Sequence, residues 1–479
     1  MNHDSPLPGI GTRITRYGTI LAVSGIVCKI MLLVYTVLAV DILGREGFGR
    51  IEYFIEMAII FSVLIDFGLE QTVTREVARR REDTGAMLYP LLMFRLAAAL
   101  AGGVVMAAFL WLLAQPGHTS ALILASITYF LVISVIMLVR AVIRGLELMT
   151  FEGIANILDK VVHIGLAILL LFAFPCLPLI VLCYTSGAMV SLLIYLGIIL
   201  KRIGISRETY SYQDWIDWQK LAVPIGLSAA CILLLHREDT VMVNWIRGDE
   251  ETGLYRAPYR FLEGLFLFPQ VLAISAYPVF SKLFHDKQPF SQSASDLLRG
   301  LIIISLPIAV GGTCIGTGMM TSLTPELGQA GGIVFILLLW SLPFIYANFL
   351  LGTILNATDR QHRNFQASAW GLASNALLNI PAIYWFGAYG AAVVTAVSQA
   401  VYCLIMLIYV HDFKLITGLP RYAAIGAACL VMAALLHLID FAWYIEVLIG
   451  GVTYLAALAA FQGVTGREML TLWSVVKRR

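Results

Sequence analysis

The sequence predicts an all-α membrane protein with about fourteen transmembrane helices, and three observations support this fold class. First, 59% of the 479 residues are hydrophobic and only 13% are charged, whereas soluble domains contain about 25% charged residues. Second, apolar runs of roughly 20 residues, long enough to cross a bilayer as a helix, recur along the chain. Third, lysine and arginine are alternately abundant and scarce in successive breaks between the runs.

The apolar runs divide into fourteen expected spans, because turn signals such as Leu43-Gly44 and Gly387 separate them. We place the spans at residues 17–41, 50–70, 86–114, 119–142, 153–174, 177–200, 220–246, 254–279, 296–320, 331–356, 364–386, 388–411, 420–439 and 443–464. With the N-terminus in the cytoplasm, 24 of the 32 lysines and arginines fall on the cytoplasmic side and 4 on the other side. Positive charge accumulates on the cytoplasmic side, so we expect both termini there, in a multi-pass protein of the inner or plasma membrane.

The chain contains a weak internal repeat. Shifting the sequence by 204 residues places 49–53 over 253–257, and each copy follows a charged external turn. Since the copies begin spans 2 and 8, six spans apart, they run in the same direction. We therefore expect two pseudo-symmetric six-helix lobes, related by an axis along the membrane normal. The predicted divisions are a first lobe (1–200), a cytoplasmic inter-lobe loop (201–219), a second lobe (220–411), and two accessory helices with a basic tail (412–479).

Several charged side chains lie at bilayer depth. A charge there costs about 2.5–3.5 kcal/mol or more, so it normally faces a bundle interior or a wet cavity. Lys29 is twelve residues into the first span, which is about 18 Å along the helix. Arg237 and Asp239 lie at similar depth in span 7, which therefore needs protein or water on all sides. Arg95 and His163 also fall within spans, and we expect them to be structural.

The second span carries charges along one helical face. Spacings of three and four residues align Glu52, Glu56, Ile59, Val63, Asp66 and Glu70. The repeat maps Glu52 onto Arg256 and Glu56 onto Arg260. Because equivalent residues face each other across a twofold axis, we expect two ion pairs near the external mouth, Glu52–Arg256 and Glu56–Arg260.

The region 43–83 resembles the start of bacterial lipid-linked oligosaccharide flippases of the Wzx type, members of the multidrug/oligosaccharidyl-lipid/polysaccharide exporter superfamily. The matching positions are Leu43, Gly44, Phe48, Gly49, Asp66, Gly68, Leu69, Arg75 and Arg79. Residues 238–242 and 253–257 are similar to a second pattern of that family. The resemblance implies a two-lobed fold, alternating access, and a polyprenyl-pyrophosphate-linked oligosaccharide as cargo.

The resemblance gives the intramembrane charges expected roles. Lys29, Arg237, Arg256 and Arg260 would bind the pyrophosphate and sugar, since arginine offers paired donors to phosphate. Glu52, Glu56, Asp66, Asp239 and Glu263 would act as gate or ion-coupling groups. Static pairing that only holds the lobes together is the alternative for these carboxylates.

Two other functions compete with flipping. A multidrug or organic-cation antiporter of the same superfamily would need an acidic cavity, which the basic residues argue against. A membrane polysaccharide polymerase or ligase would need a large external loop, whereas the longest external break has about ten residues. We therefore expect no enzyme activity, no metal site and no cofactor, with coupling to H⁺ or Na⁺ left open. The expected partners are lipid-linked oligosaccharide, membrane lipids and polysaccharide assembly proteins, but no nucleic acid, and the expected state is a monomer.

Overall fold

The computed structural model describes residues 10–66, 68–81, 84–203 and 226–463, and the regular structure in these ranges is helical throughout. Eleven helical segments of the described chain are long and apolar enough to cross a membrane. A helix satisfies its own backbone hydrogen bonds in lipid, which explains this architecture. The predicted fold class, an all-α multi-pass membrane protein, is confirmed. The segments are Val23–Leu64, Thr84–Leu112, Ser120–Gly145, Met149–Ala173, Leu177–Arg202, Asp249–His285, Ser291–Leu323, Gly328–Ala357, Gln361–Tyr409, Leu419–Leu438 and Trp443–Ala460.

Glycine kinks explain how eleven segments give the predicted fourteen spans. Helix α1 (Ile10–Leu64) bends at Gly44 and α14 (Gln361–Tyr409) bends at Gly387, so each supplies two spans. Both glycines have positive φ, 68° and 58°, a conformation that other residues rarely adopt. Helix Gly226–Leu235 and α8 (Glu238–Arg247), joined by a turn, supply one more span. Within the described residues, the spans therefore number fourteen.

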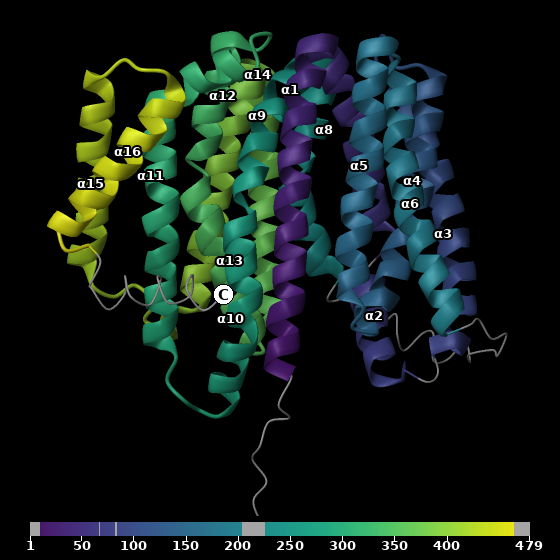
Figure 1. Ribbon diagram of the computed structural model, residues 1–479, viewed down its shortest axis with the longest axis horizontal. Helices are drawn as coiled ribbons and strands as arrows, with labels where there is room; N and C mark the ends of the chain where they lie inside the picture. The colour runs from purple at the N-terminus through teal and green to yellow at the C-terminus, as the bar shows by residue number, and fades with distance from the viewer. Residues whose placement is uncertain (1–9, 67, 82–83, 204–225, 464–479) are drawn as a thin grey trace, which may run out of the picture. The chain divides into compact units, whose positions relative to one another are not determined.

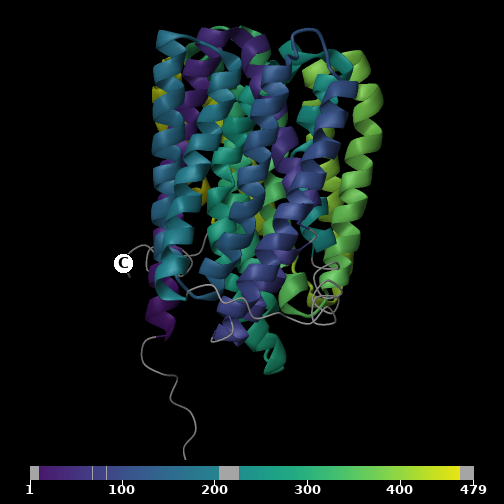
Figure 2. The same cartoon turned by 90° about the vertical axis from the view of Figure 1, so that its right-hand side faces the viewer.

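The chain forms two compact units, Met1–Leu267 with Ser368–Ala391, and Phe268–Ala367 with Ala392–Arg479. In the first unit, α1 packs against α5 and α9, while α6 packs against α4 and α5. Figures 1 and 2 show the long helices α3 to α6 side by side. The remaining helices of this unit are α2 (Leu69–Arg79), α3 (Thr84–Leu112), α4 (Ser120–Gly145), α5 (Met149–Ala173), α6 (Leu177–Arg202) and α9 (Asp249–Leu265).

The second unit has its own buried core. Helices α15 and α16 pack on each other and on α11 through apolar side chains that include Met432, Leu436 and Tyr454. Asn348 of α13 donates a hydrogen bond of 2.9 Å to the side-chain oxygen of Gln399. The helices are α10 (Leu267–His285), α11 (Ser291–Leu323), α12 (Gly328–Leu339), α13 (Leu342–Ala357), η2 (His411–Phe413), α15 (Leu419–Leu438) and α16 (Trp443–Ala460).

The lobe boundaries and the cytoplasmic location of both termini stay predictions. Most of the predicted inter-lobe loop, 204–219, lies outside the described residues. The same holds for the extreme termini, residues 1–9 and 464–479.

The backbone repeats itself at the predicted offset of 204 residues. Gly44 has φ 68° and ψ 173°, and Gly248 has φ 89° and ψ −174°. Both pairs of angles lie in the same glycine-specific region. Each glycine precedes the helical stretch that carries Glu52 in one copy and Arg256 in the other. The two turns are therefore structural equivalents, which supports the internal repeat.

The same repeat creates a close helix contact between α1 and α9. A Cβ atom at Gly49 would overlap the carbonyl oxygen of Asp249, and one at Gly253 would overlap the carbonyl oxygen of Arg45. The offset of 204 residues relates Gly49 to Gly253 and Arg45 to Asp249, so the two contacts are reciprocal, as a local twofold requires. Glycine lets the two backbones approach this closely, as small residues do in membrane helix pairs.

The predicted single face from Glu52 to Glu70 is wrong beyond Leu64. Helix α1 ends there, and Gly68 adopts a left-handed conformation with φ 80° before α2 begins. Asp66 accepts a hydrogen bond of 3.2 Å from the backbone N–H of Glu70, which helps to start the new helix. Asp66 and Glu70 therefore belong to a separate structure from Glu52 and Glu56.

Candidate functional site

Charged side chains of α1 and α9 meet in one buried cluster. Glu52 and Glu56 lie one helical turn apart on α1, opposite Arg256 on α9. Arg256 donates to Glu52 at 3.1 Å, to Glu56 at 2.5 Å and to Glu263 at 3.2 Å. All four side chains are buried. One guanidinium therefore holds three carboxylates within the membrane-spanning part of the first unit.

Two further arginines complete these pairs. Arg260 binds both carboxylate oxygens of Glu52, at 2.5 and 2.6 Å. Arg237, at the break between the helix Gly226–Leu235 and α8, donates to Glu56 at 2.5 Å. The predicted pair Glu52–Arg256 is confirmed.

The predicted pair Glu56–Arg260 is wrong, because Glu56 binds Arg256 and Arg237 instead. Helical side chains point back toward their own N-terminus. The long side chain of Arg260 therefore reaches the carboxylate of Glu52. This carboxylate lies one helical turn before Glu56, the partner that the repeat predicts for Arg260.

Lys29 adds a fourth cation at longer range. Its charge interacts most strongly with Glu263, and then with Arg260, Arg237 and Arg256. We define the charge cluster as Lys29, Glu52, Glu56, Arg237, Arg256, Arg260 and Glu263. With four cations and three carboxylates, it carries one surplus positive charge. The expected pyrophosphate-binding role of Lys29, Arg237, Arg256 and Arg260 stays a prediction: Arg237 and Arg260 are paired with carboxylates, and of the four only Arg237 lines the cavity described below.

Asp239 lies in a different polar environment from the charge cluster. It accepts hydrogen bonds from the hydroxyl of Tyr255 at 2.7 Å and from the amide of Asn379 at 2.6 Å. Both donors are neutral. The sequence missed Asn379 because nothing in the apolar run around it marks its proximity to α8.

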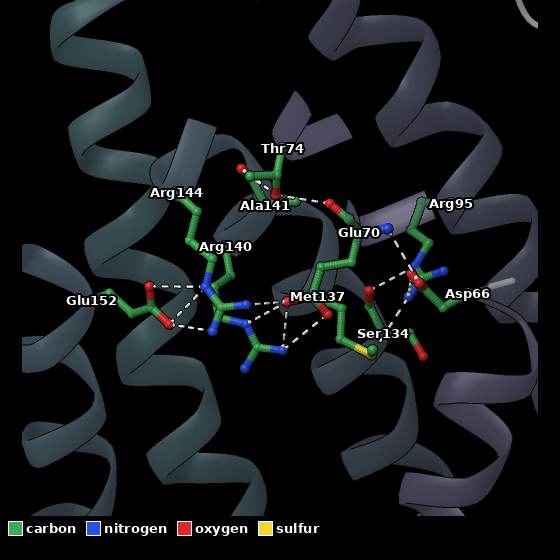
Figure 3. Close-up of polar contacts among 10 residues, drawn as sticks. All are labelled: Asp66, Glu70, Thr74, Arg95, Ser134, Met137, Arg140, Ala141, Arg144 and Glu152. Atoms are coloured by element: carbon green, nitrogen blue, oxygen red, sulfur yellow. Dashed lines mark hydrogen bonds and ion pairs between the residues drawn. The ribbon is translucent and has the colours of Figure 1, made fainter. Parts of the chain in front are cut away.

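Asp66, between α1 and α2, belongs to a second charged network that includes residues of α3 and α4 (Figure 3). Arg95 lies 3.1 Å from Asp66 and donates to the backbone oxygen of Ser134 at 2.7 Å. Arg95 therefore has a charged partner, which the sequence analysis failed to identify. Burial raises the pKa of the Asp66 carboxyl, while the Arg95 guanidinium opposes that shift.

The rest of this network joins α2 to α4 and α5. Glu70 accepts from Arg140 at 3.2 Å and from Arg144 at 2.9 Å, and Arg144 also binds Glu152 at 2.6 Å. Figure 3 shows the two arginines converging on Glu70. The network anchors α2 to the long helices and is separate from the charge cluster.

Replacing Arg95 with leucine should destabilise the protein in a pH-dependent way. Breaking a buried ion pair costs about 3–5 kcal/mol. Without Arg95, the pKa of Asp66 in the folded protein rises further above its unfolded value, so folding takes up a proton. The deficit in stability should therefore shrink as the pH falls toward 5. Melting temperatures in detergent at pH 5 to 8 measure this, and Asp66→Asn/Arg95→Leu should remove the pH dependence. An equal deficit at every pH would contradict this explanation.

A cavity of about 510 Å³ adjoins the charge cluster inside the first unit. Arg237 belongs to both the cluster and the cavity lining. The polar and charged part of the lining also includes Ser24, Ser62, Tyr129, Arg140, Asn156, Asp159, Lys160, Ser191 and Tyr195. Three cations and one carboxylate therefore face this space. The arrangement suits an anionic, polar ligand.

Comparison with known proteins agrees with this architecture. The probable flippase AglR of Haloferax volcanii is 25% identical over 194 residues, which is 40% of this chain and 40% of AglR. The chain thus aligns with less than half of that relative's length.

Solved structures share the fold across nearly the whole chain. The lipid II flippase MurJ, in an inward closed conformation, superposes with a TM-score of 0.74 at 18% identity, covering 92% of this chain and 98% of MurJ. An inward-facing multidrug resistance MATE transporter of the MOP superfamily gives a TM-score of 0.62 at 15% identity, covering 82% and 96%.

The family model for polysaccharide biosynthesis proteins matches residues 14–284, more than half of the sequence. The match includes α1 to α9, and therefore all of the charge cluster and the cavity lining. This chain belongs to the polysaccharide biosynthesis protein family.

Proposed function

We propose that this protein flips a polyprenyl-pyrophosphate-linked oligosaccharide from the cytoplasmic to the outer leaflet by alternating access, for surface polysaccharide biosynthesis. The observation that carries the proposal is the charge cluster, whose surplus positive charge adjoins a polar cavity at Arg237. A diphosphate is anionic and a glycan is polar, so both parts of the headgroup suit this environment. The name of AglR and the MurJ fold support the same proposal.

Export of organic cations is the second candidate, because the MATE fold is also similar. Such a cargo would favour carboxylates without paired cations. Here Glu52 and Glu56 are both held by arginines, and cations outnumber carboxylates in the cavity lining. The site therefore favours an anionic cargo, and its parts act by binding rather than by covalent chemistry.

The proposal includes a location, an orientation and an energy source. We place the protein in the inner or plasma membrane as a monomer, with both termini in the cytoplasm and polysaccharide assembly proteins as partners. Coupling to H⁺ or Na⁺ would use a carboxylate among Glu56, Asp66, Asp239 and Glu263. Measuring the flipping rate under imposed proton and sodium gradients tests that coupling.

Reconstitution in vesicles tests the proposed function. Purified protein is incorporated with a sugar-labelled polyprenyl diphosphate cargo, and an external lectin reports the sugar exposed outside. We expect the protein to accelerate exposure at least tenfold over protein-free vesicles. A polyprenyl carrier of the same sugar without phosphate and a fluorescent organic cation serve as control cargoes. Transport of the cation with no movement of the diphosphate cargo would reject flipping and favour the exporter.

A further inference from the structure

One side of the cavity contains polar groups that the charge cluster does not use. Arg140 of α4, Lys160 of α5 and Tyr195 of α6 all line it. In the sequence, Arg140 and Lys160 count among the positive charges expected on the cytoplasmic side. They were therefore assigned no binding role. Their convergence on one cavity is visible only in the folded structure.

Arg140 has hydrogen-bond donors to spare. Its Nε and Nη2 atoms bind the two carboxylate oxygens of Glu70, both at 3.2 Å (Figure 3). Glu70 also accepts from Arg144 at 2.9 Å. The carboxylate therefore keeps a cationic partner when Arg140 turns toward a ligand, and the Nη1 group of Arg140 takes no part in the Glu70 contact.

Tyr195 supplies an independent sign of a ligand. The residue is 1% exposed, and its hydroxyl has no hydrogen-bond partner among the described residues. A buried hydroxyl without a partner is unfavourable, so such groups usually bind a ligand or an ordered water. Tyr195 and Arg140 line the same cavity, so this unpartnered hydroxyl belongs to a residue that an occupant of the space would contact.

Lys160 completes the set. Its ammonium group lies 3.5 Å from Asp159 and its side chain is 29% exposed. An arginine, a lysine and a phenol hydroxyl together offer charge-assisted hydrogen bonds of the kind that phosphate oxygens accept.

We propose that Arg140, Lys160 and Tyr195 form a second anion subsite, which binds a phosphate or diphosphate group. The inference deepens the proposed function, because the diphosphate of the lipid-linked cargo is one source of that group. A free phosphate or diphosphate ion is the other source. Arg237 lines the same cavity and also belongs to the charge cluster.

The sharpest test replaces Tyr195 with phenylalanine. The change removes one hydroxyl without a protein partner, so the melting temperature should hold or rise. Affinity for inorganic pyrophosphate, measured by calorimetry on protein in nanodiscs of zwitterionic lipid, should fall about tenfold or more, as expected for one lost bond to a charged ligand. Tyr184→Phe is the matched control, because Tyr184 is another buried tyrosine of α6 and is absent from the cavity lining.

Arginine variants provide a second test of the same subsite. Arg140→Gln should weaken pyrophosphate binding about tenfold or more, and Arg144→Gln should not. Both arginines bind Glu70, but only Arg140 lines the cavity. Equal losses in the two variants would indicate a structural effect and overturn the subsite, as would unchanged affinity in Tyr195→Phe and Arg140→Gln.

Repeating these measurements with polyprenyl diphosphate in the nanodiscs identifies the source of the anion. If the variants weaken binding of both ligands, the lipid headgroup occupies the subsite. If they weaken only inorganic pyrophosphate, the occupant is the free ion. Binding that depends on Tyr195 in a protein that moves no cargo would support the subsite and reject the proposed function. Flipping of the cargo, with a pyrophosphate affinity that the variants leave unchanged, would support the proposed function and reject the subsite.

Discussion

Replacing Gly253 with alanine is expected to force α1 and α9 apart. The new methyl group would overlap the carbonyl oxygen of Arg45, and backbone atoms cannot move aside as a flexible side chain can. Adjusting a packed site to an extra methyl group typically costs about 1–3 kcal/mol, and more where the obstacle is backbone. We expect a clear fall in melting temperature.

Gly165→Ala on α5 provides the matched control. A Cβ atom there meets no atom within 4 Å, so the change adds helix propensity without a clash. This variant should be as stable as the parent protein or slightly more stable. If Gly253→Ala and Gly165→Ala behave alike, the close contact between α1 and α9 does not exist as described.

Replacing Arg256 with glutamine should have the second large effect. The side chain is 1% exposed and is the shared partner of Glu52, Glu56 and Glu263. Removing it leaves buried carboxylates short of positive charge, at a cost of about 3–5 kcal/mol. We expect little folded protein in detergent, measured by size-exclusion chromatography and thermal unfolding.

A compensating change separates charge imbalance from lost packing. Glu263→Gln added to Arg256→Gln removes the carboxylate that loses its ion pair with Arg256, while Glu52 keeps Arg260 and Glu56 keeps Arg237. The double variant should recover part of the lost stability, since residues in one network are not additive. No recovery would mean that Arg256 contributes mainly through packing.

One ion pair of the charge cluster could be predicted because the repeat is visible in its residues. Glu52 and Arg256 stand 204 positions apart, as Gly44 and Gly248 do, and Arg256 contacts Glu52. The partners of Glu56 and Arg260 could not be predicted correctly. The repeat relates backbone positions, and it does not say how far an arginine side chain extends along its helix.

Other contacts depend on packing that no local pattern encodes. Arg95 looks isolated within its span, and its partner Asp66 comes close only because Gly68 ends one helix and redirects the chain. Arg140 and Lys160 resemble ordinary cytoplasmic charges. Their role in the cavity lining follows from the way α4, α5 and α6 pack around a shared space.

Lys29→Met tests the central claim, that surplus positive charge in the cluster attracts a diphosphate cargo. Within the described residues Lys29 forms no ion pair, so its removal strands no close partner and leaves three cations facing three carboxylates. Lys29 supplies the surplus charge, so its loss should weaken the Coulomb attraction for the diphosphate. The initial flipping rate at limiting cargo, measured in vesicles with the lectin readout, should fall at least tenfold while the melting temperature stays near that of the parent. An unchanged rate in a stably folded Lys29→Met protein would contradict the claim.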